Sequence, residues 1–352
     1  MNPDCSPQYS IVVATRDRGS KIVNLIESIM KSSVDNYELV IVDQSSNDDT
    51  KNSVDPFLVD RHVTYIHTTT SGASHARNLG ISLTTGPYIA ITDDDCIVPP
   101  DWLTKLSRPF EEEPRVGVVF CSVVPVPVAA LGHTPSIVFS KDRIFKSATK
   151  AWLSSTKGLS LGAGMAIRRA MLQDVPGFDE SMGPGAKFGA AEDNDLSWRG
   201  LLRGWWTFQN AEVCVVHDGF RPIEELKALV VRDFYGVGGA VAKYLRIGKW
   251  QIVWFLGSWV VRFGVILPAR DLIAGRRPRG FRRPYMLLRG VRDGLRTPLR
   301  RGDLTYPPAP EDGRGVIVLS SRLVVDPEMV GEASSQCDDR QGRIGMAPRG
   351  EH

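Results

Sequence analysis

The chain has 352 residues, of which 42% are hydrophobic and 24% charged, as in soluble globular proteins with one large core or two modest ones. The formal net charge of +3 argues against nucleic-acid binding through overall charge. The five cysteines contain no CxxC pair, so neither a zinc site nor a disulfide framework is expected, and a reducing compartment fits. The first ten residues, MNPDCSPQYS, lack the basic and apolar regions of a secretory signal, so we expect a cytoplasmic protein.

Short apolar runs alternate with amphipathic segments along the first 120 residues. Runs rich in Val and Ile predict buried strands at residues 9–14, 38–42, 63–66, 88–92 and 116–120. Apolar side chains at helical spacing, or a loop that runs into such a pattern, predict helices at residues 20–31, 48–54 and 71–82. Uniformly apolar strands that alternate with helices predict an α/β fold with a mostly parallel sheet flanked by helices.

The second part of the chain is less regular. Residues 122–160 contain three prolines in VVPVPVAALGHTP and no clear period, which favours a loop-rich stretch that faces the substrate. Further elements are expected in the order strand, helix, strand and strand, at residues 163–169, 193–203, 205–209 and 213–216. The last of these strands ends at His217.

From residue 221 the composition changes. Residues 251–269 are nearly all apolar and almost long enough to cross a bilayer, although Arg262 near their middle costs about 3 kcal/mol in lipid. Residues 246–301 hold fourteen basic and two acidic side chains, a local charge of +12. Aromatic side chains beside dense arginine suit an anionic membrane surface, although a basic helix packed on the protein's own surface would give the same pattern.

These observations predict three regions. Residues 1–220 form the α/β domain, residues 221–303 form a basic and apolar helical region that associates with a membrane, and residues 304–352 form a largely disordered tail. The composition does not decide whether residues 251–269 span the bilayer or lie on it.

Three consecutive aspartates, Asp93, Asp94 and Asp95, follow the predicted strand at 88–92. Adjacent carboxylates repel one another, and a divalent cation among them removes that cost. Mg²⁺ and Mn²⁺ prefer hard oxygen ligands and share them with substrate phosphates. Ligands of parallel sheets bind beyond the carboxyl ends of the strands, where this triplet lies. We therefore predict a metal and phosphate site there, with a solvated acidic turn as the plainer alternative.

Five segments, in this order, resemble glycosyltransferase family 2. They are YSIVVATRDR, ELVIVDQSSNDDT, SGASHARNLGISLTTGPYIAITDDDCIVPPDWL, GAGMAIRRAMLQDVPGFDE and AEDNDLSWRGLLRGW, and they cover roughly residues 8–218. The resemblance implies a GT-A fold, a nucleotide-diphosphate sugar donor with a UDP-sugar expected, Mg²⁺ or Mn²⁺, and inversion at the anomeric carbon. No processive QxxRW motif follows residue 200, which favours the addition of a single sugar.

The resemblance also assigns roles to individual residues. Those that would bind the nucleotide sugar are Ala14, Thr15, Arg16, Asp43, Arg77, Asp93 and Asp94. Those that would bind the metal are Asp93 and Asp95, at the two ends of the DxD motif, and His217. Asp193 matches the catalytic base. The sequence VDQSS after the second strand keeps Asp43 but departs from the commoner VDDGS, which leaves the base preference open.

Elementary chemistry supports these roles. A divalent ion neutralises the charge of a leaving diphosphate, and one carboxylate can take the proton of the acceptor hydroxyl. Asp193 lies at the predicted start of a helix, where the dipole favours its ionised form. The plainer alternatives are helix N-capping for residues 192–195 and a structural hydrogen bond for His217.

Three other functions were considered. A dehydrogenase needs GxGxxG after the first strand, and a sugar nucleotidyltransferase needs a glycine-rich loop there, but the chain has ATRDRGS. A catalytically inactive sugar-nucleotide-binding or scaffolding protein at the membrane stays open, although it would not need Asp193. The expected acceptor is a glycan or lipid-linked glycan in cell-surface polysaccharide or glycolipid synthesis, which rests on analogy.

Overall fold

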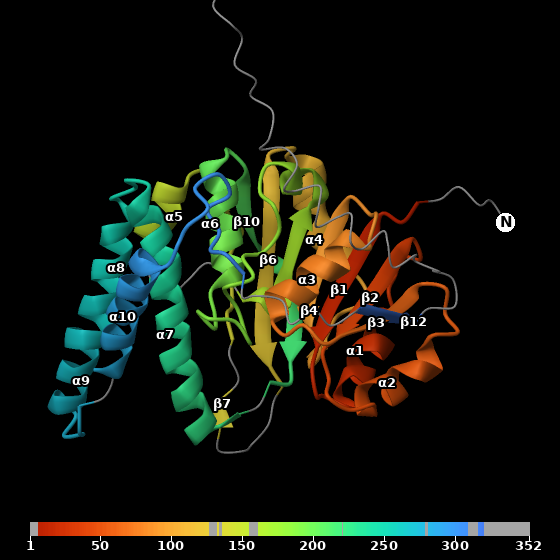
Figure 1. The fold of residues 1–352 in the computed structure, drawn as a ribbon, viewed down its shortest axis with the longest axis horizontal. Coiled ribbons are helices and arrows are strands. Elements are labelled where there is room, and N and C mark those ends of the chain that lie inside the picture. The colour runs from red at the N-terminus through yellow and green to blue at the C-terminus, as the bar shows by residue number, and fades with distance from the viewer. Residues whose placement is uncertain are drawn as a thin grey trace, which may run out of the picture.

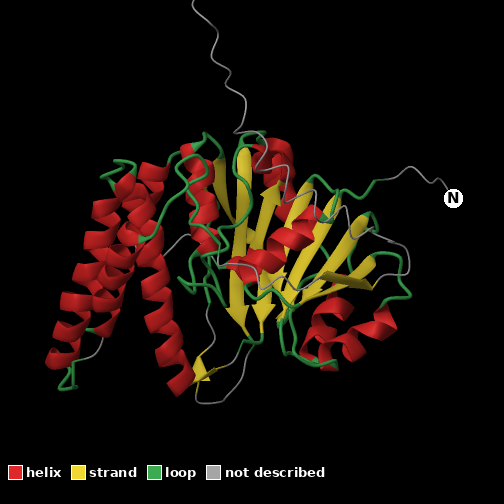
Figure 2. Cartoon of the chain, in the orientation of Figure 1, coloured by secondary structure: helices red, strands yellow, loops and turns green. Residues whose placement is uncertain are grey.

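A twisted sheet runs through the molecule, with helices on both faces and a group of helices at one end (Figures 1 and 2). The computed structural model describes residues 6–126, 132–133, 136–154, 161–219, 221–278, 281–308 and 316–319. The strands of the main sheet are β1 Tyr9–Thr15, β2 Tyr37–Asp43, β3 Val63–Thr68, β4 Tyr88–Asp93, β5 Cys96–Ile97, β6 Val116–Pro125, β8 Arg143–Phe145, β9 Met165–Arg168, β10 Trp206–His217 and β12 Val316–Leu319. Two short strands, β7 Gly132–His133 and β11 Arg221–Pro222, form a separate pair.

The strand order is β12-β3-β2-β1-β4-β9-β6-β10-β5, and β8 pairs with β10. Strands β3, β2, β1 and β4 are parallel neighbours, and β6 and β10 are parallel to each other. Strand β9 lies antiparallel between β4 and β6. The mostly parallel α/β sheet predicted from the sequence is therefore confirmed, with β9 as an antiparallel insertion.

The helices are α1 Lys21–Ile29, α2 Asp49–Val54, α3 Ala73–Ser82, α4 Trp102–Glu112, α5 Ala148–Ser154, α6 Glu192–Leu202, α7 Ile223–Arg246, α8 Ile252–Val261, α9 Leu267–Ile273 and α10 Arg282–Arg296. A π-helical turn, Arg262–Ile266, joins α8 to α9. Figure 1 shows α3 and α6 on the near face of the sheet, and α7 to α10 grouped beyond one edge of it.

Three sequence-based expectations need correction. The strands expected at 205–209 and 213–216 are one strand, β10, whose register against β6 shifts between Asn210 and Cys214. Helix α4, which contains Pro109, was not among the expected helices. The stretch 122–160, expected to be loop-rich, contains the end of β6 and all of β8 and α5, while residues 127–131, 134–135 and 155–160 lie outside the described residues.

Successive side chains of β1 point to opposite faces of the sheet and pack into two different core clusters. Ile11 and Val13 belong to the cluster that includes Leu25 of α1 and Leu106 of α4. Val12 points to the opposite face, where it packs with residues that include Ile81 of α3. A fully apolar strand is needed because both faces are covered.

Helices α7 and α10 touch through their backbones. A Cβ atom added to Gly238 would lie 2.1 Å from the carbonyl oxygen of Leu287, and one added to Gly290 would lie 2.1 Å from that of Tyr235. Any side chain at these two positions would push the helices apart. The glycines therefore set the closeness of this contact rather than the flexibility of the helices.

A buried ionic cluster joins α7 to α6. The Nζ atom of Lys243 lies 2.5 Å from Asp179 Oδ2 and 2.9 Å from Asp195 Oδ2. The Nε atom of Arg199 lies 2.9 Å from Asp195 Oδ2. The four side chains are at most 2% exposed, and their formal charges cancel. This cluster holds the predicted helical region 221–303 against the α/β part.

The packed part of the chain continues past residue 303. Leu304 and Tyr306 are buried, and the backbone N–H of Tyr306 donates a hydrogen bond to Asp179 Oδ2 over 2.8 Å. Strand β12 pairs with the edge strand β3. These segments were expected to belong to the disordered tail 304–352, and residues 320–352 lie outside the described residues.

We expect the substitution Lys243→Met to lower the free energy of unfolding by about 3–5 kcal/mol, because it leaves two buried carboxylates to face one arginine. Urea denaturation followed by circular dichroism measures this change. Lys249→Met, at an exposed position after α7, is the matched control and should change stability by less than about 0.5 kcal/mol. Equal stability of the two variants would contradict the importance of the cluster.

Candidate active site

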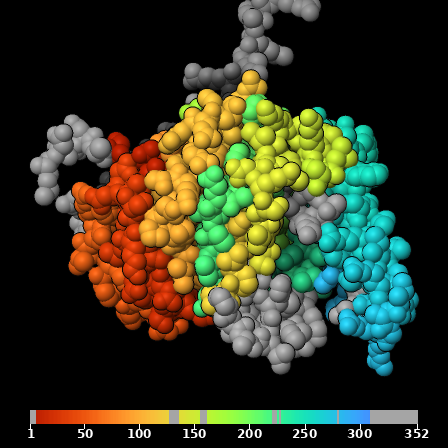
Figure 3. Space-filling view, turned by 180° about the vertical axis from the view of Figure 1, so that it is seen from behind, coloured from red at the N-terminus to blue at the C-terminus, as the bar shows by residue number. Residues whose placement is uncertain are grey.

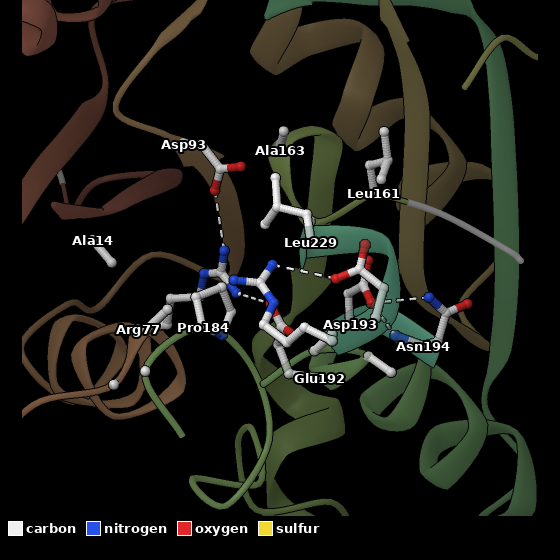
Figure 4. Close-up of a pocket in the computed structure, with 18 of the residues that line it drawn as sticks. Ala14, Arg77, Asp93, Leu161, Ala163, Pro184, Glu192, Asp193, Asn194 and Leu229 are labelled. Carbon is white, nitrogen blue, oxygen red and sulfur yellow. Dashed lines mark hydrogen bonds and ion pairs between the residues drawn. The ribbon is translucent and has the colours of Figure 1, made fainter. Parts of the chain in front are cut away.

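A cleft of about 670 Å³ opens at the carboxyl ends of β1 and β4 and extends across the start of α6 to α7 and α8. Nine of the ten predicted site residues line it: Ala14, Thr15, Arg16, Arg77, Asp93, Asp94, Asp95, Asp193 and His217. Figure 4 shows Asp93 and Asp193 on different sides of the same cleft. The fold thus brings together side chains that lie up to 203 positions apart in the sequence (from 14 to 217).

The acidic triplet contacts one side chain from the end of β1, Thr15, and one from the loop after it, Arg18. The hydroxyl of Thr15 donates a hydrogen bond to Asp94 Oδ2 over 2.7 Å. The guanidinium of Arg18 lies 3.3 Å from Asp94 Oδ1 through Nε and 3.2 Å from Asp95 Oδ2 through Nη2. Arg18 was missed in the sequence, although its place in the loop after the first strand, close to a predicted acidic site, is a usable signal.

The environments of Asp94 and Asp95 shift their pKa values in opposite directions. Burial raises the pKa of Asp94 to about 6, against the opposing effect of the Arg18 charge. Burial alone would also raise the pKa of Asp95, but the hydrogen bond and charge of His217, with the charge of Arg18, bring that pKa below its ordinary value. Asp95 is therefore the more firmly ionised of the two, as a metal ligand requires.

His217 ends β10 next to Asp95, and its Nε2 atom lies 3.0 Å from Asp95 Oδ1. The register of β10 with β5 sets His217 opposite Cys96. Ligand atoms of Asp95, Cys96 and His217 all lie within 4.8 Å of one another, so they could hold a metal ion. A Cβ atom added to Gly219 would lie 2.3 Å from His217 Cε1, so a side chain at this position would push the ring from its place beside Asp95. Cys96 was not among the predicted site residues.

Arg77 of α3 joins two sides of the cleft. Its Nη1 atom donates a hydrogen bond to Glu192 Oε1 over 2.7 Å, and its Nη2 atom donates one to Asp93 Oδ1 over 3.1 Å (Figure 4). The guanidinium also lies 5.6 Å from the centre of the Phe178 ring. Two carboxylates and burial to 4% exposure fix its position. Arg77 therefore acts as a brace between the end of β4 and the start of α6.

Asp193 lies in the first turn of α6, directly after the Glu192 that Arg77 holds. The backbone N–H and the side-chain amide of Asn194 both donate hydrogen bonds to Asp193 Oδ1, over 2.6 and 2.9 Å. The N-cap residue is Ala191, which makes no side-chain capping bond and adopts a left-handed φ of 71°. No side chain caps the start of α6, so the structure does not support N-capping as the role of residues 192–195.

Asp43 is the exception among the predicted donor-binding residues. It is fully buried, and it does not line the cleft. The backbone N–H and hydroxyl of Ser45 donate hydrogen bonds to its Oδ1 atom, and the hydroxyl of Tyr65 donates one to its Oδ2 atom. The neighbouring Gln44 lines the cleft instead. Asp43 therefore shapes the turn after β2 from behind the cleft wall.

Comparisons with known proteins show the family of this chain. The profile described as Glycosyl transferase family 2 matches residues 10–175. A glucosyl-dolichyl phosphate glucuronosyltransferase of Haloferax volcanii is 32% identical over 244 residues, which cover 65% of this chain and 74% of that protein. This chain belongs to glycosyltransferase family 2. The resemblance seen in the sequence is confirmed, and the protein is a glycosyltransferase.

Two further similarities are shorter in sequence or limited to the fold. Glycosyltransferase GlyG of Streptococcus pneumoniae is 34% identical over 110 residues, so the match spans 31% of this glycosyltransferase and only 36% of GlyG. A mannosyltransferase from Pyrobaculum calidifontis, solved with GDP-Man and Mn²⁺, superposes with a TM-score of 0.56 at 19% identity, over 84% of this chain and 88% of that one. The superposition supports the GT-A fold.

We expect Asp95→Ala to weaken Mn²⁺ binding by about tenfold or more, because the ion loses a carboxylate ligand that lies next to His217. Isothermal titration calorimetry of Mn²⁺ into protein with UDP measures the affinity. Asp35→Ala, which removes a carboxylate that is 82% exposed on the surface, is the control and should bind Mn²⁺ as the wild type does. An unchanged affinity in Asp95→Ala would show that Asp95 is not a ligand.

Proposed function

We propose that this glycosyltransferase moves a sugar from a nucleotide-diphosphate donor, with a UDP-sugar expected, to an acceptor hydroxyl with inversion. The observation that carries the proposal is that the acidic triplet and Asp193 line one cleft and are linked through Arg77 and Glu192. A donor diphosphate near the triplet would leave its sugar facing the start of α6. Inversion needs one base and no covalent nucleophile, and Asp193 is the carboxylate placed for it.

The chemistry follows from these positions. The acceptor oxygen forms a bond to the anomeric carbon while the bond from that carbon to the diphosphate breaks, and the diphosphate keeps the electron pair. Asp193 takes the proton of the acceptor hydroxyl, and the two hydrogen bonds from Asn194 hold that carboxylate in place. Thr15, Arg16 and Ala14 would contact the nucleotide at the end of β1.

The residues beside the triplet fit a divalent cation. Asp95 and His217 place a carboxylate and an imidazole within 3.0 Å of each other, and Asp93 has a partly exposed carboxylate in the same cleft. Carboxylate oxygens suit Mg²⁺ and Mn²⁺, and the imidazole favours Mn²⁺ of the two. When bound, the ion would neutralise charge on the diphosphate. The Mn²⁺ bound to the Pyrobaculum mannosyltransferase supports this choice.

Membrane association is the second part of the proposal. Among the described helices, Ile252–Ile273 is the only stretch that is long and apolar enough to cross a bilayer, and 17% of its most apolar window is buried. Exposed apolar side chains on this stretch include Trp254, Val265 and Ile273. With α10, these helices form one end of the molecule (Figure 3). These exposed residues and the surrounding arginines support attachment at the cytoplasmic face of an anionic membrane.

The acceptor is proposed to be a glycan or a lipid-linked glycan in cell-surface polysaccharide or glycolipid synthesis. The Haloferax relative is named as a transferase that acts on a glucosyl-dolichyl phosphate, and this name supports a lipid-linked acceptor. The alternative, a catalytically inactive sugar-nucleotide-binding protein, does not need a carboxylate at Asp193 that Asn194 holds toward the cleft.

We expect Asp193→Asn to lower the transfer rate by about a hundredfold or more while the donor affinity stays within about twofold, because the substitution removes the base and keeps the shape. The assay incubates the wild type with Mn²⁺ and UDP-, GDP- and dTDP-sugars and measures released nucleotide. Asp35→Asn serves as the exposed control. If the wild type releases no nucleotide from any donor, or if Asp193→Asn keeps full activity, the enzymatic proposal is wrong.

We expect the double substitution Trp254→Glu and Val265→Glu to lower co-sedimentation with phosphatidylglycerol vesicles by at least about tenfold, because two charges must then enter the interface. Val59→Glu, at a position 92% exposed on the α/β part, should leave co-sedimentation unchanged. Equal binding by the double variant and the wild type would contradict membrane attachment through these helices.

A further inference from the structure

The cleft has two chemically different ends. One end holds the acidic triplet, Thr15 and His217. The other end is formed by α7 and α8 and is lined by the apolar side chains of Leu229, Val237 and Trp259. Figure 4 shows Leu229 beside Asp193 and Glu192, so the apolar end begins next to the proposed base. A nucleotide sugar has no apolar part that would occupy this second end.

The apolar end leads to the surface proposed to face the membrane. Phe255 and Trp259 line the cleft one helical turn apart on α8. Trp254 and Val261, on the same helix, are 66% and 49% exposed. A single helix therefore presents one apolar face to the cleft and another to the outside. A long apolar chain that lies along this helix would have its inner end in the cleft that Asp193 also lines.

One cation lies in this apolar wall. The Nη2 atom of Arg232 on α7 is 3.2 Å from the carboxylate of the next residue, Asp233, and the side chain is 40% exposed. Its Nε atom is buried and has no hydrogen-bond partner among the described residues. A Cβ atom added to Gly189 would lie 2.6 Å from Arg232 Cγ, so the loop before α6 packs on the stem of this arginine. The stem of Arg232 is thus held by this loop, while part of its side chain stays exposed in the cleft.

The other arginines that line the described part of the cleft lie at its donor end. Arg77 and Arg18 contact the acidic triplet, and Arg16 contacts the neighbouring Asp17. Arg232 is set apart from them by its place on the apolar wall. An arginine on such a wall, with a side chain that is 40% exposed, can offer its outer guanidinium N–H groups to an anion such as phosphate.

We propose that the α7–α8 end of the cleft binds an amphiphilic acceptor that carries a phosphate group next to a long apolar chain. Arg232 binds the phosphate, and the chain lies along Phe255 and Trp259 toward the exposed face of α8. The acceptor sugar beyond the phosphate then reaches Asp193. This inference rests on the proposed sugar transfer. It narrows the proposed acceptor, a glycan or a lipid-linked glycan, to one whose lipid phosphate is bound by Arg232.

Calorimetry with the full-length chain and three probes tests the inference. Farnesyl phosphate has both the anion and the chain, farnesol has only the chain, and inorganic phosphate has only the anion. We expect farnesyl phosphate to bind at least about tenfold more tightly than either of the others. Equal affinity for farnesol would show that no anion is recognised, and equal affinity for inorganic phosphate would show a plain anion site. Either result overturns the proposal.

Variants then locate the bound probe. Arg232→Gln should weaken farnesyl phosphate binding by about tenfold and leave farnesol unchanged, whereas Trp259→Leu should weaken both. Arg292→Gln is a matched control, because Arg292 on α10 also contacts the aspartate that follows it, at 3.2 Å, but lies outside the cleft. If Arg292→Gln weakens farnesyl phosphate binding as much as Arg232→Gln does, the probe binds the general basic surface and the proposal is wrong.

Failure of the acceptor inference can be distinguished from failure of the proposed sugar transfer. If the wild type releases nucleotide from a sugar donor with Mn²⁺ but does not prefer farnesyl phosphate, only the acceptor inference fails. If no donor is bound or cleaved while farnesyl phosphate binds at Arg232, the lipid site stands and the transfer proposal fails. The comparison of the three probes uses the wild type alone, so it holds even if a variant does not fold.

Discussion

The buried guanidinium of Arg77 is the contact on which the arrangement of this site depends. It lies between Asp93 at the end of β4 and Glu192 at the start of α6, two segments about a hundred residues apart. The pair with Glu192 is largely removed from water, whereas Asp93 is partly exposed. Losing the arginine would therefore leave Glu192 buried without its charged partner. Its planar fork lets one side chain hold two carboxylates at once, which a lysine could not do with the same geometry. The distance from the acidic triplet to Asp193 follows from this brace.

A second buried ionic cluster attaches the C-terminal helices to α6. Lys243 of α7 contacts Asp195, two residues after Asp193, and Asp179 in the loop before α6. Helix α6 is therefore fixed at its start by Arg77, which also holds Asp93, and on another side by Lys243. As a result, the walls of α7 and α8 belong to the same cleft as the strand ends. The C-terminal helices and the strand ends of the sheet therefore line one continuous cleft.

The acidic triplet shows how neighbouring carboxylates are given different properties. Asp94 is buried against Thr15 and Arg18, and its pKa is raised, while His217 and Arg18 lower the pKa of Asp95. Asp93 is turned toward Arg77. Three identical side chains in a row thus have three different sets of partners. The repulsion expected among them is relieved by nearby cations even before any metal ion is considered.

The sequence alone determined the features that depend on local pattern. Apolar runs with turn residues between them specify the strands from β1 to β4, and the positions of Asp93 to Asp95 and Asp193 follow from motifs within single segments. The sequence did not predict contacts between side chains that lie far apart along the chain. Only the tertiary structure decided that Asp43 turns away from the cleft to Ser45 and Tyr65, that Arg18 meets the triplet, and that Arg232 enters the cleft wall. Helix packing and strand register decide which side chains face one another across long sequence separations, and no local pattern carries that information.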